Sequence, residues 1–224
     1  DVNIEAMKRV YFPENLLDVV QAANVRHLEN SMDKFKIFNP YARIAILGVV
    51  GKECNFKVGS EVSYKNTPND RIRMIFGSRL ANYNDTQLTV LKKDDYDFFN
   101  AVYGGMYQND TTEGFKYRGR GFNQITFKAN YDTIAKIIGV DIVANPDLMM
   151  DAKIAADATI AYFVNRWRSK PVDVPQLADL RNINDATLFL FRANAGWNKN
   201  IDTTFHKQTL DKVRNWSKNF TYIN

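Results

Sequence analysis

The chain has 224 residues, of which 45% are apolar and 25% charged, and its formal net charge is +5. These values are typical of a globular protein and exclude a disordered chain, which would contain too few apolar residues to form a core. One cysteine, Cys54, excludes an internal disulfide. Two histidines, His27 and His206, are too few for the usual zinc sites, so no metal and no cofactor are expected.

The charge and the apolar runs narrow the choice of partners. The longest apolar run, residues 42–50, is interrupted by Arg43 and is far shorter than the roughly 20 residues that span a bilayer, so no membrane insertion is expected. Residues 1–11 lack the basic start and apolar stretch of a secretory signal, so we expect any such signal to be already removed or never present. Basic residues are scattered rather than grouped, and no nucleic-acid partner is expected.

Apolar residues at helical spacing predict an amphipathic helix pair at residues 14–23 and 25–35. Asn39 and Pro40 then form a start signal for a helix over residues 42–50. That helix carries apolar residues on nearly every side, so we expect it to be buried.

The rest of the chain is also predicted to be mainly helical. Residues 67–70 open a helix that places Ile72, Ile75, Phe76 and Leu80 on one face. Residues 103–121 are rich in glycine with little apolar periodicity, which predicts a long loop of the kind that is often functional. Further helices are predicted at residues 94–102, 130–138, 151–167, 184–194 and 202–216, and a short β-hairpin at residues 58–64.

These elements predict a mainly α protein. We expect a bundle of roughly eight to ten helices with a loop-lined cleft and at most a small β-hairpin. The length predicts one domain over residues 1–224, with a possible small lobe around residues 57–125.

Two glutamates are candidates for acid–base chemistry. Glu53 directly follows the predicted buried helix, where desolvation would disfavour its charged form, as a general acid requires. Glu61 comes shortly afterwards, and the intervening loop could fold back so that the two carboxylates face each other across a cleft, as in glycosidases. The alternative is that Glu53 pairs near a helix end and Glu61 is merely solvated.

A family resemblance begins with the run YRGRGFNQIT at residues 117–126, which is followed by Asn130 and Tyr131. This run resembles the Y-x-G-R-G-x-x-Q-[LI]-T-x-x-x-N-Y signature of glycoside hydrolase family 19, the group of chitinases and phage lysozymes. NPDL at residues 145–148 and NAG at residues 194–196 are similar to two further segments of the family. The resemblance covers roughly residues 16–216.

The resemblance implies a lysozyme-like α+β fold and a glycoside hydrolase catalytic domain that cleaves β-1,4 bonds between N-acetylated amino sugars with inversion. Glu53 would be the acid that protonates the glycosidic oxygen, and Glu61 the base that activates water. Thr126 would hold that water through its hydroxyl. Gln124 and Asn130 would bind sugar hydroxyl or acetamido groups, which suits an amide that both donates and accepts.

Two further residues are weaker candidates for substrate contact. Tyr64 resembles a family tyrosine that lines the cleft, and Asn194 belongs to the segment that resembles the family's N-G-G turn. The structural alternatives are that Tyr64 is part of the core, and that Gln124 and Asn130 are loop amides that satisfy the backbone. The chain departs from the family at the acid, where relatives commonly read H-E-[ST]-G-G and residues 52–56 read KECNF.

The catalytic residues do not choose between substrates, because chitin and peptidoglycan share the same linked sugar units. The lack of disulfides and the charge of +5 favour peptidoglycan, and therefore a phage-type endolysin or muramidase. Chitin is the alternative substrate, and a non-catalytic carbohydrate-binding subunit of a lytic assembly is the second alternative, with a wall-targeting partner unknown. We expect a phage protein to pass from the host cytoplasm to the bacterial cell wall, or the chain to be secreted after processing.

Overall fold

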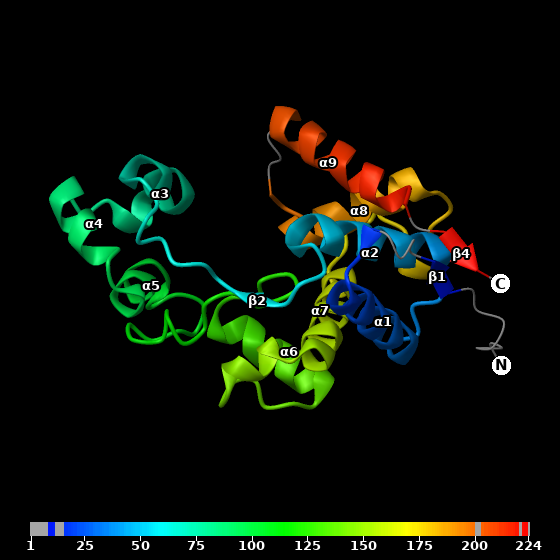
Figure 1. Ribbon diagram of the computed structural model, residues 1–224, viewed down its shortest axis with the longest axis horizontal. Helices are drawn as coiled ribbons and strands as arrows, with labels where there is room; N and C mark the ends of the chain where they lie inside the picture. The colour runs from blue at the N-terminus through cyan, green and yellow to red at the C-terminus, as the bar shows by residue number, and fades with distance from the viewer. Residues whose placement is uncertain (1–8, 12–15, 200–202, 220, 224) are drawn as a thin grey trace. The chain divides into compact units, whose positions relative to one another are not determined.

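The computed structural model describes residues 9–11, 16–199, 203–219 and 221–223, and these residues fall into two compact units (Figure 1). The first unit comprises residues 1–58 and 151–224, and the second comprises Gly59–Met150. The second unit begins close to the start of the expected lobe and extends beyond its predicted end. The expectation of one catalytic domain over the whole chain stays a prediction.

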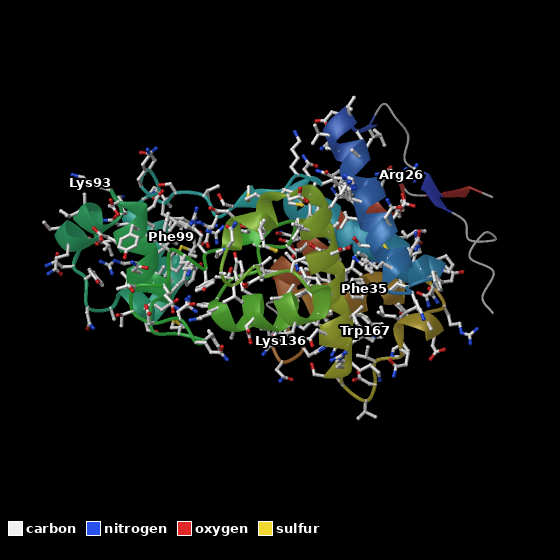
Figure 2. All side chains as sticks on the ribbon, turned by 90° about the horizontal axis from the view of Figure 1, so that it is seen from below. Arg26, Phe35, Lys93, Phe99, Lys136 and Trp167 are labelled. Carbon is white, nitrogen blue, oxygen red and sulfur yellow. The ribbon has the colours of Figure 1, made fainter. Side chains whose placement is uncertain are left out.

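The first unit is a helical bundle. The helix α1 packs against α7, and α2 packs against both α8 and α9 (Figures 1 and 2). Among the described helices, none is long and apolar enough to cross a membrane. The elements of this unit are β1 (Arg9–Tyr11), α1 (Val19–Lys34), α2 (Pro40–Cys54), α7 (Ala152–Arg168), the 3-10 helix η5 (Leu177–Asp179), α8 (Ile183–Ala195), α9 (Thr203–Ser217) and β4 (Thr221–Ile223), which pairs antiparallel with β1.

The buried helix α2 confirms the prediction for residues 42–50. The Asn39 side chain caps it by accepting a hydrogen bond from the Ala42 N–H at 3.1 Å, and Pro40 occupies its first turn. The helix ends where Asn55 adopts the left-handed conformation with a φ of 57°. Between these two signals the residues from Ala45 to Gly51 are all buried.

Arg43 lies inside this helix and is almost completely buried. Its Nη1 donates to the Asp33 carboxylate at 2.8 Å and to the Ile37 carbonyl at 3.0 Å, and its Nη2 lies 3.9 Å from Glu29, which is itself fully buried. A buried charge is tolerated only when it is paired and hydrogen-bonded. Arg43 therefore ties α2 to the helix that carries both carboxylates, α1.

The prediction of two helices before residue 36 is wrong, because one helix, α1, covers this region. The Asp18 side chain accepts from the Gln21 N–H at 2.7 Å and the Gln21 side chain accepts from the Asp18 N–H at 3.0 Å, which starts the helix at Val19. No glycine or proline then interrupts it. Glu14 and Asn15, which begin the expected first helix, lie outside the described residues.

The second unit contains shorter elements. The helices expected at residues 94–102 and 130–138 are confirmed, whereas α4 was not predicted and Ile75 is exposed rather than part of the buried face. The elements are β2 (Gly59–Ser60), α3 (Asn69–Phe76), the 3-10 helix η3 (Gly77–Leu80), α4 (Asp85–Leu91), α5 (Asp95–Tyr103), β3 (Arg120–Gly121), α6 (Lys128–Ile138) and the 3-10 helix η4 (Pro146–Met150).

In the first unit, the helices expected at residues 151–167 and 184–194 are confirmed by α7 and α8. The expectation for residues 202–216 is met by α9, with Asp202 outside the described residues.

The predicted hairpin at residues 58–64 is wrong. The strand β2 pairs antiparallel with the distant β3, with Gly59 opposite Gly121 and Ser60 opposite Arg120. The Glu61 N–H extends this pairing by donating to the Gly119 carbonyl at 2.7 Å. The signature run, and not a neighbouring strand, thus satisfies the backbone of this segment.

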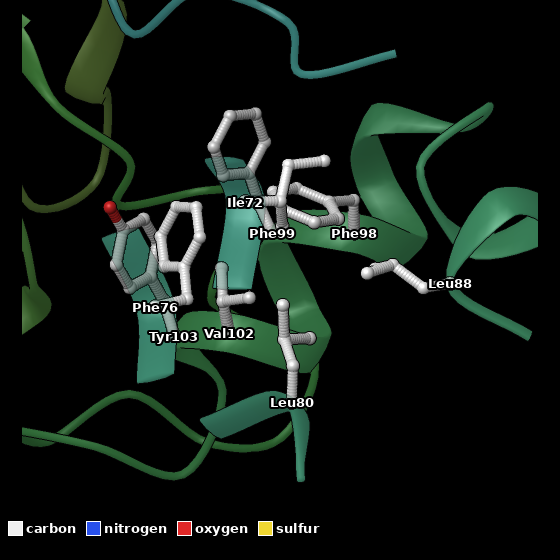
Figure 3. Packing of buried hydrophobic residues seen from close by; sticks show 8 residues of the cluster. All are labelled: Ile72, Phe76, Leu80, Leu88, Phe98, Phe99, Val102 and Tyr103. Carbon is white, nitrogen blue, oxygen red and sulfur yellow. The ribbon is translucent and has the colours of Figure 1, made fainter. Parts of the chain in front are cut away.

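An aromatic and aliphatic cluster forms the core around α3 and α5 in the second unit (Figure 3). Phe76 and Phe98 meet edge to face with their ring centroids 5.4 Å apart, a favoured geometry for aromatic pairs. Figure 3 shows the Tyr103 hydroxyl pointing out of the cluster. The members are Ile72, Phe76, Leu80, Leu88, Phe98, Phe99, Val102 and Tyr103.

The glycine-rich loop after α5 returns closely onto that helix. A Cβ added at Gly114 would lie 2.8 Å from the Asn100 Cα and would also overlap the Phe99 carbonyl oxygen. A Cβ at Gly104 would lie 2.6 Å from the Thr111 carbonyl oxygen. Backbone atoms cannot swing aside as flexible side chains can, so these two positions require glycine.

We predict that Gly114→Ala lowers the free energy of unfolding by about 1–3 kcal/mol, because the methyl group overpacks against backbone. Gly59→Ala is the matched control, since a Cβ there would meet nothing within 4 Å. Its expected effect is within about 0.5 kcal/mol. Urea unfolding of both variants measures the difference, and equal stabilities would contradict the close approach at Gly114.

Candidate active site

Glu61 lies directly after β2 and is held by groups from three other parts of the second unit. Its Oε1 accepts hydrogen bonds from the Tyr103 hydroxyl at 2.8 Å and, at a longer 3.4 Å, from the Tyr64 hydroxyl. Its Oε2 accepts from the Gly119 N–H at 3.2 Å. The half-buried carboxylate is therefore anchored to α5 and to the signature run at the same time.

The two tyrosines act on Glu61 as neutral donors. Burial, followed by the negative charge of Glu61, raises the pKa of Tyr64 to about 12 and raises the pKa of Tyr103 well above its ordinary value. A carboxylate offers about four acceptor positions, and these donors occupy three of them. One position remains through which Glu61 can bind a water or a substrate hydroxyl.

Sequence reasoning did not single out Tyr103. It is separated from Glu61 by 42 residues and lies at the last position of α5, at the start of the predicted loop. Its only local signal is that it continues the apolar spacing of Phe99 and Val102. That signal predicts a core residue and gives no indication of a hydroxyl turned toward a carboxylate.

Arg120 of the signature run has a structural position. Its guanidinium is buried and donates to the Lys116 carbonyl at 2.7 Å, to the Tyr131 hydroxyl at 3.0 Å and to the Asp147 carboxylate at 3.0 Å. The Tyr131 hydroxyl in turn donates to the Arg118 carbonyl at 2.7 Å. These bonds fix the loop backbone that carries Gly119.

Gly119 brings Thr126 and Gln124 to the same place as Glu61. A Cβ added at Gly119 would lie 2.9 Å from the Gln124 Oε1 and 3.2 Å from the Thr126 Oγ1. The Thr126 hydroxyl donates to the Gln124 carbonyl at 3.0 Å, so its lone pairs remain as acceptors. Three residues of the predicted site, Glu61, Thr126 and Gln124, thus adjoin one glycine.

The amide nitrogens of Gln124 and Asn130 serve the backbone of the loop. The Gln124 Nε2 donates to the Gly59 carbonyl at 3.0 Å and to the Gly121 carbonyl at 3.3 Å, and the Asn130 Nδ2 donates to the Thr126 carbonyl at 2.8 Å. The structural alternative for both residues is therefore present. Their sugar-binding roles stay predictions, and a sugar would be bound mainly through the amide oxygens.

Tyr64 combines a core position with a site contact. Its ring packs against Phe76, Phe98 and Phe99 with centroid separations of 5.1, 5.3 and 6.0 Å, while its hydroxyl faces Glu61. Its predicted contact with substrate stays a prediction.

Glu53 lies in the last turn of α2, in the first unit, and its side chain is exposed. The expected burial is wrong, because the fully buried part of α2 ends at Gly51 and the chain turns away after Cys54. Burial raises the pKa of the half-buried Cys54 thiol to about 11, and the thiol donates to the Val50 carbonyl at 3.2 Å. Cys54 is therefore a neutral thiol beside Glu53, whose role as the acid stays a prediction.

Asn194 also lies in the first unit, in the last turn of α8. Its backbone carbonyl accepts a hydrogen bond from the Tyr162 hydroxyl at 3.1 Å, and its contact with substrate stays a prediction. In the part of the chain that the structure describes, His, Cys, Asp and Glu side chains form no group of three or more that could hold a metal ion.

The raised tyrosine pKa values predict a loss of stability in alkali. Burial raises the pKa of Tyr64 and of Tyr131 to about 12, above the ordinary value of 10.0, so folding disfavours their ionised forms. Their contribution is complete below about pH 10 and declines as the pH rises toward about 12. Tyr64→Phe should therefore lose less stability over this window than the unchanged protein, in urea unfolding measured at several pH values. The exposed Tyr96→Phe is the control, and identical pH dependence in all three proteins would contradict the prediction.

Comparison with known proteins agrees with the signature run. The family model described as Chitinase class I, of glycoside hydrolase family 19, matches residues 96–176. Chitinase 2 of Oryza sativa subsp. japonica is 43% identical over 54 residues, which cover 24% of this chain and 14% of that protein. Basic endochitinase of Vitis vinifera is 46% identical over 54 residues, which cover 24% of this chain and 16% of that protein. The matched segment thus spans only a small part of the length of these relatives.

A solved structure extends the likeness to the fold. Chitinase C from Streptomyces griseus aligns with 92% of this chain and 77% of its own, with a TM-score of 0.50 and 16% sequence identity. At this identity the likeness concerns the fold alone, and it confirms the mainly α class. The segment that the family 19 model matches, residues 96–176, includes Tyr103 and Gly119, the two groups with the shortest hydrogen bonds to the Glu61 carboxylate.

Proposed function

We propose that this chain is a glycoside hydrolase that cleaves the β-1,4 bonds of chitin. One observation carries the proposal: the Glu61 carboxylate is held by Tyr103 and Gly119, both of which lie in the family 19 segment. A carboxylate with fixed orientation and one remaining acceptor position suits a general base. The relatives that match 54 residues of this chain are named chitinases, which supports chitin as the substrate.

In the proposed mechanism Glu61 and Thr126 hold the attacking water together. Since the Thr126 hydroxyl already donates to the Gln124 carbonyl, it would accept one hydrogen of the water. Glu61 would accept the other hydrogen through its remaining position and remove it as the water oxygen attacks the anomeric carbon. Attack by water opposite the leaving oxygen inverts the configuration at that carbon.

Glu53 is the proposed acid in this mechanism. The leaving sugar oxygen needs a proton, and a carboxylic acid is the usual donor in glycosidases. Its assignment rests on the family resemblance and on its place at the end of α2. Gln124 and Asn130 are the proposed sugar contacts, and Tyr64 and Asn194 are weaker ones.

Peptidoglycan, the substrate favoured by the sequence, is kept as a second candidate. The observation in its favour is the net charge of +5, since a positive field would attract an anionic cell wall more than neutral chitin. The names of the matched relatives favour chitin instead. A non-catalytic sugar-binding role would differ from both because neither polymer would be cut.

The decisive assay follows reducing ends released from colloidal chitin and from purified peptidoglycan. We predict that the unchanged protein cuts chitin, and that Glu61→Gln lowers the rate about 100-fold or more, the usual contribution of a general base. Asp132→Asn is the control, because it removes a carboxylate from the same unit whose one ion pair among the described residues is an i,i+4 pair with the exposed Lys136. Cleavage of peptidoglycan alone would support the second candidate, whereas full activity of Glu61→Gln would refute the assignment of the base.

Tyr103→Phe tests the positioning of Glu61. We predict a kcat about tenfold lower with little change in KM, because a hydrogen bond to a charged group contributes about 1.5–3 kcal/mol and this one orients the base. Tyr96→Phe is the matched control, since Tyr96 is an exposed tyrosine on α5, the same helix that carries Tyr103. Equal kcat values for the two variants would show that the Tyr103 hydroxyl does not position Glu61.

A further inference from the structure

A cavity of about 850 Å³ lies wholly within the first unit and contains none of the residues proposed for catalysis. Its walls come from the end of α1 and the segment that leads to α2, from the end of α7 and from the segment around η5. Phe35 and Trp167, labelled in Figure 2, are on two of these walls, and Phe38 adds a third aromatic ring. The volume is within the range of about 300–1,000 Å³ that is typical of small-molecule sites.

The charges that line the cavity are all positive. Lys36, Arg168 and Lys170 are lining residues, and no Asp or Glu is among them. Within the described residues, neither Lys36 nor Arg168 has a carboxylate within ion-pair distance, and both are exposed. The Lys170 side chain also lines the cavity, and its Nζ donates to the Val174 carbonyl at 2.7 Å.

Helix termini explain only part of this charge. Arg168 is the last residue of α7, where a cation complements the negative end of the helix. Lys36 and Lys170 lie beyond the ends of α1 and α7, so their place at the cavity is not required by either helix. Because every charged side chain of the lining is basic, the cavity favours an anionic occupant.

The walls are preformed. The Trp167 Nε1 donates to the Pro175 carbonyl at 3.0 Å, which fixes the ring, and the Asn39 Nδ2 donates to the Ala178 carbonyl at 3.1 Å and the Leu180 carbonyl at 2.8 Å. These bonds join the segment before α2 and the end of α7 to the segment around η5. A site fixed in this way can bind a ligand with little ordering of its own side chains.

We propose that this cavity binds an acidic saccharide, meaning a sugar that carries a carboxylate or a phosphate group. The apolar rings would contact the face or acyl group of the sugar, and the three cations would attract its acid group. The choice of a sugar rests on the proposed function, whereas the preference for an anion rests on the lining alone. The site would hold an acidic glycan independently of the cleavage reaction.

Nuclear magnetic resonance titration of the labelled protein gives the most direct test. N-acetylmuramic acid and N-acetylglucosamine are matched probes, because they differ only by the lactyl ether group that carries the carboxylate. We expect shifts at the backbone amides of Lys36, Leu177 and Ala178 with the acidic sugar, and none there with the neutral one. N-acetylglucosamine 1-phosphate shows whether the site also accepts a phosphate in place of the carboxylate. If inorganic phosphate causes the shifts and neither acidic sugar does, the proposal that the ligand is a saccharide is overturned.

Charge variants supply the control. Lys36→Gln with Arg168→Gln should weaken binding about fivefold or more, because the double variant removes two of the three cations that line the cavity. Lys93→Gln with Lys153→Gln removes the same charge at exposed positions outside the cavity and should leave binding unchanged. Equal weakening in both double variants would overturn the site and indicate a general charge effect.

Ala178→Phe tests the location without changing the charge. Ala178 lines the cavity and is exposed, so the larger phenylalanine side chain would fill part of the cavity. Loss of the shifts is expected, and unchanged binding would overturn the location. Cleavage is scored separately on polymer. If the protein cuts polymer but the acidic sugar causes no shifts at the cavity, this inference alone is refuted. If the acidic sugar binds at the cavity but no polymer is cut, the proposed function alone is refuted.

Discussion

The buried guanidinium of Arg120 determines the conformation of the signature run. A group that stays charged and is only 3% exposed must be hydrogen-bonded within the protein. Arg120 meets this constraint by binding the Lys116 and Arg118 carbonyls, the Tyr131 hydroxyl and Asp147. The backbone between Lys116 and Arg120 is thereby fixed, and it presents both the N–H and the carbonyl of Gly119 to Glu61. The buried charge of Arg120 thus determines where the proposed base, Glu61, lies, without any need for Arg120 to contact a substrate.

The aromatic core supplies the other support of Glu61. Tyr103 and Tyr64 both have their rings packed in or against the cluster around α5, so their hydroxyls are held at fixed positions. The Ser63 hydroxyl donates to the Asp95 carboxylate at 2.6 Å and ties the segment after Glu61 to the start of the same helix. Among the described residues, the hydrogen-bond donors that orient the proposed base all belong to the second unit. Preorganisation of this kind is what a general base requires, because reorientation during the reaction would cost rate.

The sequence predicted elements whose signals are local, and failed where the cause is distant. The buried helix α2 follows from Asn39 and Pro40 at its start, and α6 ends at Gly139, which adopts the left-handed conformation. The strand β2 could not be predicted correctly, because its partner is the signature run and not a neighbouring strand. The contact between Tyr103 and Glu61 was missed for the same reason. The exposure of Glu53 was also missed, because the apolar sequence of α2 does not show at which residue the neighbouring helices stop covering it.

Within the site, the family signature was informative at two levels. Thr126 and Gln124 lie against Gly119, and the missing side chain of this glycine leaves room for both of them. Arg120 and Tyr131 belong to the same signature but hold the loop. A motif can therefore combine residues that contact the ligand with residues that maintain the backbone, and only the structure separates them.

The stereochemistry of the first product tests the central claim most directly, namely that Glu61 directs a water onto the anomeric carbon. Proton nuclear magnetic resonance of a soluble chitin oligosaccharide during the first minutes of cleavage distinguishes the α- and β-anomers before they equilibrate. The account predicts that the α-anomer forms first from the β-linked substrate. Initial formation of the β-anomer would contradict it, because retention requires a covalent intermediate in place of direct attack by the water that Glu61 activates.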